Sequence, residues 1–171
     1  MADKGRANLL GAAYGAKSAS EVASVYDAWA ATYDRQMVEF GYRHPNIGLA
    51  LTSRHLPRGS VPILDAGAGT GLLGELLAIL GYPHIEALDI SEGMLAVAAK
   101  KGCYKASHQV DLSGPLPFAS GAFSAVTAVG VFTTGHVGPE ALDELIRVTR
   151  KGGIIVLTCK QSLWDLSLIH I

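Results

Sequence analysis

Short apolar runs alternate along this chain with stretches in which apolar residues recur every three or four positions. The runs predict strands at residues 62–65, 82–90, 125–131 and 154–159, and a further strand is expected within residues 105–110. The run at 125–131 is continuous and small, which is typical of a parallel strand covered on both faces. Strands that alternate with helical segments predict an α/β fold.

Helical spacing of apolar residues predicts the intervening helices, at residues 21–40, 45–55, 72–80, 92–101 and 140–149. A capping-box pattern, Ser18-x-x-Glu21, precedes the first of them. The buried face of the helix at 45–55 is expected to consist of Ile47, Leu49, Ala50 and Leu51.

The length of 171 residues suits one domain. Residues 1–17 lack clear periodicity and are expected to form a flexible arm, so that 18–171 make up the domain. Only twelve residues follow Cys159, and they can supply one short strand at most.

Composition narrows the function classes. Apolar residues make up 49% of the chain and charged ones 17%, as in a globular α/β protein. The net charge of −1, without a basic stripe, disfavours nucleic-acid binding. No apolar run reaches the roughly 18 residues of a membrane span, and the N-terminus lacks a signal-peptide core. Two distant cysteines and scattered histidines indicate neither a disulfide framework nor a metal site, so a cytoplasmic location is expected.

A glycine-rich turn follows the first predicted strand. Residues 65–71 read D-A-G-A-G-T-G, with glycine at every second position from Gly67. Glycine permits positive φ and close approach of the backbone to a ligand. The turn also exposes the free N–H groups of a helix start, which favour acceptors and negative groups. It predicts a nucleotide-type cofactor at this point.

The identity of that cofactor depends on Asp65 and on the glycine spacing. A dinucleotide fingerprint G-x-G-x-x-G that begins at Gly67 fails at Leu72, and the match that begins at Gly69 lies late after the strand. An acid at the strand end is unfavourable beside a pyrophosphate but suits an ammonium and a sulfonium. D-x-G-x-G-x-G after a strand resembles the first motif of the class I S-adenosylmethionine-dependent methyltransferases.

The acid of the second predicted strand, Asp89, lies 18 residues after Gly71. This distance suits an acceptor of hydrogen bonds from two ribose hydroxyls. The alternative is an N-cap of the following helix, for which Ser91 is an equally good candidate. Ile90 and Met94 would then pack against adenine, although either could be a core residue.

Further segments resemble the same family. Residues 26–34 are similar to its Y-D-x-W-A-x-x-Y-D segment, which covers the cofactor, and imply roles for Tyr33 first and Tyr26 second; the alternative is a plain amphipathic helix. Asp111 matches an acid that takes the adenine amino group, and the backbone N–H of Leu112 would face a ring nitrogen. The alternative for Asp111 is an Asx turn before Ser113.

Departures from the family pattern lie in the second half. Ser124 stands where the segment P-F-x-x-x-x-F-D has its acid, and Lys151 replaces the proline of E-x-x-R-V-L-K-P-G-G. The C-terminal antiparallel hairpin of the family is largely missing. Its absence would leave the fifth strand with an unpaired edge, which invites self-association.

The sequence resembles in particular the methyltransferase-like family named for the Williams–Beuren syndrome chromosomal region. The resemblance implies a Rossmann-like, doubly wound, mostly parallel sheet in the order 3-2-1-4-5. It also implies in-line transfer of a methyl group from S-adenosylmethionine to an unidentified, small-molecule acceptor, with S-adenosylhomocysteine as product. The implied cofactor-binding residues are Tyr26, Tyr33, Asp65, Ala66, Gly67, Gly69, Gly71, Asp89, Ile90, Met94, Asp111, Leu112 and Val129.

A general base is not evident. His136 follows the fourth strand and is a candidate, but a single loop histidine is more often a surface residue. Two alternatives stay open: a cofactor-binding module without turnover, and an NAD-dependent oxidoreductase. The second is disfavoured by Asp65, by the glycine spacing and by the lack of a Tyr-x-x-x-Lys pair.

Overall fold

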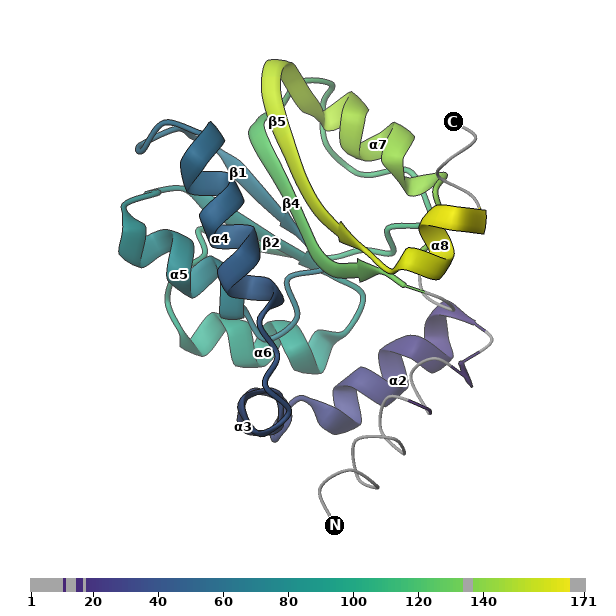
Figure 1. Cartoon of the computed structure of the whole chain (residues 1–171). Coiled ribbons are helices and arrows are strands. Elements are labelled where there is room, and N and C mark those ends of the chain that lie inside the picture. The colour runs from purple at the N-terminus through teal and green to yellow at the C-terminus, as the bar shows by residue number, and fades with distance from the viewer. Residues whose placement is uncertain (1–10, 12–14, 17, 134–136, 167–171) are drawn as a thin grey trace.

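A parallel five-stranded sheet with helices on both faces organises the part of the chain that the computed structural model describes, residues 11, 15–16, 18–133 and 137–166 (Figure 1). The predicted N-terminal arm lies largely outside these residues. In chain order the elements are α2 (Ala19–Trp29), α3 (Tyr33–Glu39), α4 (His44–His55), β1 (Ile63–Ala66), α5 (Leu72–Leu80), β2 (Ile85–Asp89), α6 (Glu92–Lys100), β3 (Ala106–Gln109), β4 (Phe123–Phe132), α7 (Ala141–Val148), β5 (Thr149–Cys159) and α8 (Gln161–Leu166).

The strand order is β3-β2-β1-β4-β5, with every neighbouring pair parallel. This order and the Rossmann-like fold confirm the expectation. Ile63 of β1 pairs with Ile85 of β2 on one side and with Ala125 of β4 on the other. The direction of winding therefore reverses between β1 and β4, and ligands of open α/β sheets bind at the carboxyl ends of strands beside such a reversal.

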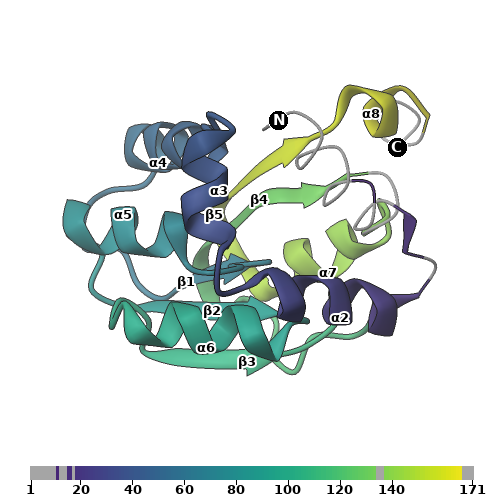
Figure 2. The same ribbon diagram turned by 90° about the horizontal axis from the view of Figure 1, so that it is seen from below.

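Alternate residues of the central strands belong to two separate hydrophobic cores, one on each face of the sheet. Ile63, Ile85 and Ala125 pack on one face with residues of α4 and α5. Leu64 and Val126 belong to the other core, which α7 covers. Figures 1 and 2 show α4, α5 and α6 on one side of the sheet and α7 on the opposite side. Because helices cover both faces of the sheet, a ligand site is expected at an edge of the sheet, where the strands end.

Local signals set the helices that follow β1 and β2. The α5 helix begins after Gly71 and ends at Gly81, both in the left-handed region with φ of 83° and 103°. The Ser91 side chain caps α6 by accepting a hydrogen bond from the Met94 N–H at 3.0 Å. These ends lie within a residue or two of the predicted ones.

The helix predicted at 21–40 is in fact two helices. The chain turns between Trp29 and Tyr33, so that α3 is seen end-on in Figure 1 while α2 is seen along its length. The turn buries Trp29 and Met37 together against Met94 of α6. Periodicity alone does not detect this turn because the same spacing continues through it.

The predicted buried face of α4 is wrong for most of its residues. Ile47 and Leu51 are 48% and 40% exposed, and Ala50 is exposed too, whereas Pro45, Gly48 and Thr52 face the sheet. A Cβ atom added at Gly48 would lie 2.8 Å from Val129 Cγ2. Small residues, not large apolar ones, therefore form the contact with β4, since the helix approaches the sheet too closely for anything larger.

The end of the described chain also differs from expectation. β5 begins at Thr149, directly after α7, because residues between Thr149 and Ile154 form an irregular, shifted stretch of the strand. A short helix, α8, stands where a short strand was expected. Within the described ranges, β5 pairs with β4 alone. None of the helices in these ranges has the length and apolar character to cross a membrane.

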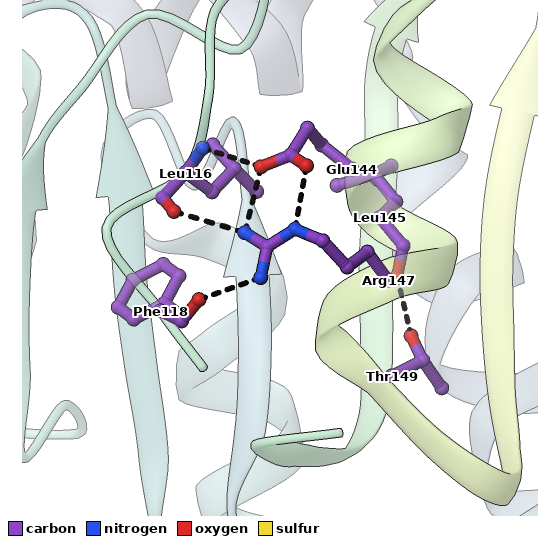
Figure 3. A network of polar contacts seen from close by, with 6 residues as sticks. All are labelled: Leu116, Phe118, Glu144, Leu145, Arg147 and Thr149. Atoms are coloured by element: carbon purple, nitrogen blue, oxygen red, sulfur yellow. Dashed lines mark hydrogen bonds and ion pairs between the residues drawn. The ribbon is translucent and has the colours of Figure 1, made fainter. Parts of the chain in front are cut away.

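An ion pair within α7 binds the backbone of the loop that follows β3. Arg147 donates to Glu144 Oε1 at 2.6 Å and to the carbonyls of Phe118 and Leu116 at 2.7 and 3.0 Å, as Figure 3 shows. Glu144 in turn accepts from the Leu116 N–H at 2.6 Å. These hydrogen bonds lower the pKa of Glu144 from its usual 4.5 to about 2. The E-x-x-R part of the family segment thus fixes a loop in this chain.

Candidate functional site

A cavity of about 390 Å³ opens at the carboxyl ends of the strands, on both sides of the junction between β1 and β4. Ten of the predicted cofactor-binding residues line it: Tyr26, Tyr33, Gly67, Gly69, Asp89, Ile90, Met94, Asp111, Leu112 and Val129. The cavity is also lined by residues that the sequence analysis did not identify as cofactor-binding: Ala16, Ser18, Ala19, Val22, Tyr42, Val110, Ser113, Gly130, Val131 and Val137. The volume lies within the range of small-molecule sites, about 300–1,000 Å³.

The glycine turn forms the floor of this cavity. The N–H groups of Gly67 and Ala68 donate to the Leu88 carbonyl at 2.7 and 2.9 Å, which ties the turn to β2. Gly67 has a φ of 72°, and a Cβ there would lie 2.3 Å from Val131 Cγ2. Gly69 has a φ of 55° and open space where its Cβ would be. The backbone at Gly67 and Gly69 can therefore approach a ligand without a side chain of its own in between.

Asp89 connects β2 to the turn at the edge of the cavity. Its carboxylate accepts from the Gly69 N–H at 2.7 Å and from the Ser91 N–H at 2.9 Å. Burial raises the pKa of Asp89, and these backbone hydrogen bonds act against the rise. Because Ser91 is the N-cap of α6, the capping alternative for Asp89 is wrong.

Asp65 lies deeper, behind the turn. It is 2% exposed and accepts from Tyr104 and Thr127 hydroxyls, each at 2.7 Å. Burial raises the pKa of Asp65 even though both hydrogen bonds lower it. Its carboxyl lines a smaller cavity of about 40 Å³, to which Gly67, Gly69 and Tyr33 also contribute.

The other predicted residues have different surroundings. Ala66 is fully buried in β1 and Gly71 is the N-cap of α5, so neither lines the main cavity. Asp111 lines it and also accepts from the Ser113 N–H at 2.8 Å, which confirms the Asx turn. His136 lies outside the described residues.

Three tyrosines border the cavity. Trp29 stacks on Tyr26 and meets Tyr33 edge-on, with ring centroids 6.0 and 4.9 Å apart. Burial first, and then the neighbouring tyrosines and acids, raise the pKa of Tyr33 well above its usual value, so its hydroxyl stays protonated. Tyr42 was not predicted. Its hydroxyl lies over Gly130, a residue within β4, where an added Cβ would be 2.3 Å away.

The proteins that this chain resembles are methyltransferases. The family model described as "Methyltransferase domain" matches residues 64–157, more than half of the chain. Human methyltransferase-like protein 27 is 35% identical over 152 residues, 87% of this chain and 62% of that protein. A demethylmenaquinone methyltransferase of Clavibacter sepedonicus is 33% identical over 145 residues, 82% of this chain and 58% of its own length.

Among solved structures, the complex of DhpI with SAH has a TM-score of 0.58 and 25% identity, and the match covers 81% of this chain and 68% of that one. The chain spans about three fifths of the length of the two curated relatives. On the family match, the curated relatives and the shared fold, the chain belongs to the methyltransferase domain family, within the class I S-adenosylmethionine-dependent methyltransferases.

Proposed function

We propose that this chain binds S-adenosylmethionine and transfers its sulfonium methyl group to a small-molecule acceptor by in-line displacement. One observation carries the proposal. The cavity at the β1–β4 junction combines an open glycine backbone at the end of β1 with two carboxylates, Asp89 at the end of β2 and Asp111 after β3. We also propose that residues 18–171 act as one domain.

The donor and acceptor set fits the cofactor. The Asp89 carboxylate would accept hydrogen bonds from ribose hydroxyls, and Asp111 with the Leu112 N–H would bind the adenine edge. Ile90 and the buried Met94 would contact the ring. The open backbone at Gly69 leaves room for the methionine portion, and ionised Asp65 would attract its ammonium group across the small cavity.

The residues of the chain contribute alignment and exclusion of water. When bound, the cofactor supplies a methyl group on a positively charged sulfur. Alignment of two reactants in one cavity can lower a barrier by about 7–11 kcal/mol without covalent participation of the protein. Tyr26 and Tyr33 would cover the cofactor and keep water from the reacting atoms.

A small, largely apolar acceptor suits the rest of the cavity. The wall beyond the cofactor residues includes Val22, Val131, Val137 and Tyr42, without a charged side chain among the described lining residues other than Asp89 and Asp111. A relative that is named for demethylmenaquinone supports an acceptor of this general kind.

A binding module without turnover is the second candidate. It is favoured because the described lining residues include no histidine, lysine or cysteine to act as a base. An acceptor that deprotonates readily would not need one. The NAD-dependent alternative loses support because the buried Asp65 lies beside the turn where a pyrophosphate would sit.

We further propose that the chain self-associates through the outer edge of β5, since that edge has no strand partner in the described part of the chain. Sedimentation velocity over a range of concentrations tests this.

We also propose a cytoplasmic location. The two cysteines, Cys103 and Cys159, are free thiols, as is usual in a reducing compartment.

Calorimetric titration with S-adenosylhomocysteine, with NAD as parallel control, tests the function. We expect micromolar binding of the first and none of the second. Asp89→Asn should weaken binding by roughly ten- to a hundredfold, because a hydrogen bond to a charged group is worth about 1.5–3 kcal/mol. Asp143→Asn, an exposed acid of α7, is the matched control and should leave the affinity unchanged.

Two outcomes would contradict the proposal: no binding of S-adenosylhomocysteine by a chain with a native circular dichroism spectrum, or binding that Asp89→Asn leaves unchanged. Turnover is then measured with S-adenosylmethionine and a panel of reduced quinones and phenols. Binding without any turnover would favour the binding module.

A further inference from the structure

Two Tyr-Asp pairs, seven residues apart, mark the helices that cover the cavity. Tyr26 and Asp27 lie in α2, and Tyr33 and Asp34 begin α3. Both tyrosines line the cavity. Neighbouring residues of a helix point about 100° apart, so the acid that follows each tyrosine faces a different neighbour.

Asp27 reaches the start of α6. Its Oδ1 accepts from the Ser91 hydroxyl at 2.5 Å and from the Gly93 N–H at 2.8 Å. Asp27 itself is exposed, whereas Ser91 is fully buried. A Cβ added at Gly93 would lie 3.0 Å from Asp27 Cα, so α2 rests directly on this turn of α6. Both views show the two helices side by side (Figures 1 and 2).

Asp34 reaches the glycine turn. The hydroxyl of buried Thr70 donates to Asp34 Oδ1, and Lys101 Nζ lies 2.8 Å from Asp34 Oδ2. The Lys101 side chain is only 14% exposed, and its second acidic neighbour, Glu75, is 3.6 Å away. Three elements therefore meet at this carboxylate: α3, the glycine turn and the end of α6.

Asp27 and Asp34 attach α2 and α3, the helices that cover the cavity, to residues on either side of Asp89. Ser91, which donates its hydroxyl to Asp27, donates its N–H to Asp89. Thr70, which donates to Asp34, directly follows Gly69, whose N–H is the other donor to Asp89. The connection thus runs from α2 through Ser91, Asp89 and the glycine turn to α3.

We propose that Asp27 and Asp34 are positioning residues that clamp α2 and α3 over the cofactor and couple this cover to Asp89. The proposal deepens the proposed function and rests on it. With the clamp intact, Tyr26 and Tyr33 stay over the bound cofactor and its release is slow. Without it, α2 and α3 separate from the sheet more often, and the cofactor leaves faster, while the sheet itself is unaffected.

Stopped-flow binding of S-adenosylhomocysteine by the full chain tests the clamp. Asp27→Asn and Asp34→Asn should each raise the dissociation rate constant on the order of tenfold, with a much smaller change in the association rate constant. Gly93→Ala should act in the same direction without a change of charge, because its Cβ pushes on the Asp27 backbone. Glu39→Gln is the matched control, an exposed acid of α3 whose nearest cation, Arg35, is 3.9 Å away.

Hydrogen exchange of the ligand-free chain supplies the second measurement. We expect faster exchange within residues 19–39 of both aspartate variants, and unchanged exchange in β1, β2 and β4. Unchanged dissociation rates and unchanged exchange would overturn the proposal. So would faster exchange throughout the sheet with a lower melting temperature, since that would indicate a merely structural role.

Failure of the proposed function is distinguishable from failure of the clamp. If the wild-type chain does not bind S-adenosylhomocysteine, the proposed function fails. Exchange in the free chain still decides whether the two acids hold the helices in place.

Discussion

Single acidic residues of this site lie in places where an ionised group is costly. Asp65 is the clearest case, since burial raises its pKa while two hydroxyls stabilise the charge. A carboxyl whose pKa is raised in the folded state stabilises the fold at low pH, and this contribution is lost as the pH rises through the folded pKa. At neutral pH, Asp65 therefore lowers the free energy of unfolding, which suggests that a ligand and not the fold requires it.

Asp65→Asn separates these two effects. The amide has the same shape without the charge, and the hydroxyls of Tyr104 and Thr127 can reorient to donate or accept. We expect the melting temperature of the free protein at pH 7 to stay equal or rise, while affinity for S-adenosylhomocysteine falls. Differential scanning calorimetry and titration calorimetry check the two halves. A lower melting temperature with unchanged affinity would show that Asp65 serves the fold instead.

The single residues of the site were predictable to different degrees. Asp65, Asp89 and the glycines stand at fixed distances from strand ends, so periodicity and spacing were sufficient to single them out. Tyr42 was not predictable, because it follows a helix end with no pattern of its own and enters the cavity only through the packing of α4 on the sheet. The partners of Asp27 and Asp34 lie far along the chain, and local spacing holds no information on them.

At the scale of whole elements, close approach is achieved with glycine. The missing Cβ of Gly48 leaves room for Val129 beside α4, and that of Gly67 leaves room for Val131 beside the turn. At Gly130 the same room is taken by the Tyr42 hydroxyl near the end of β4. Hydrophobic patterning predicted β1 and β4 well because buried parallel strands are continuous apolar runs, whereas β3 is mostly polar and alternates between half-buried and exposed residues. It failed for α4, where the face toward the sheet is small and the large apolar residues face outward.

The Gly130–Tyr42 contact gives a prediction with an internal control. Gly130 has a φ of 80°, and an added Cβ would lie 2.3 Å from the Tyr42 hydroxyl but 3.6 Å from its ring carbon Cζ. Gly130→Ala should lower stability through left-handed strain of about 1–2 kcal/mol and through displacement of Tyr42. In a Tyr42→Phe background the clash disappears and only the strain remains.

Urea unfolding of the four proteins in this double-mutant cycle measures the difference. The penalty of Gly130→Ala should be smaller in the Tyr42→Phe background. Equal penalties in both backgrounds would mean that the hydroxyl does not occupy this position in solution.

For the molecule as a whole, the acids with shifted pKa values act on stability in opposite directions. Asp65 and Asp89 have raised pKa values, and Glu144 has a pKa of about 2. A lowered pKa contributes stability that is present above the usual value of 4.5 and is lost as the pH falls toward about 2. Acidification therefore weakens the attachment of α7 to the 116–118 loop. It also removes the cost of burying Asp65 and Asp89 in their ionised form.

Glu144→Gln isolates the first of these effects. We expect the variant to be less stable than the wild type at pH 7, and the difference to shrink as the pH falls from 4.5 toward 2. Urea midpoints at a series of pH values measure it, with Asp143→Asn as the neighbouring control. A difference that stays constant over this range would assign the loss to the neutral hydrogen bonds and not to the charge.

The β1–β4 junction has a kinetic consequence. β1 pairs with β2 across one short helix, but its pairing with β4 joins Ile63 to Ala125 and requires closure of a long loop. Contacts of such high sequence separation form late and slow the folding of a domain. The cofactor cavity spans this junction, so a half-assembled sheet of β1, β2 and β3 lacks the wall made by Val129 and Val131. A ligand of this cavity would thus bind only after β4 has paired with β1, and the recovery of binding during refolding would report that step directly.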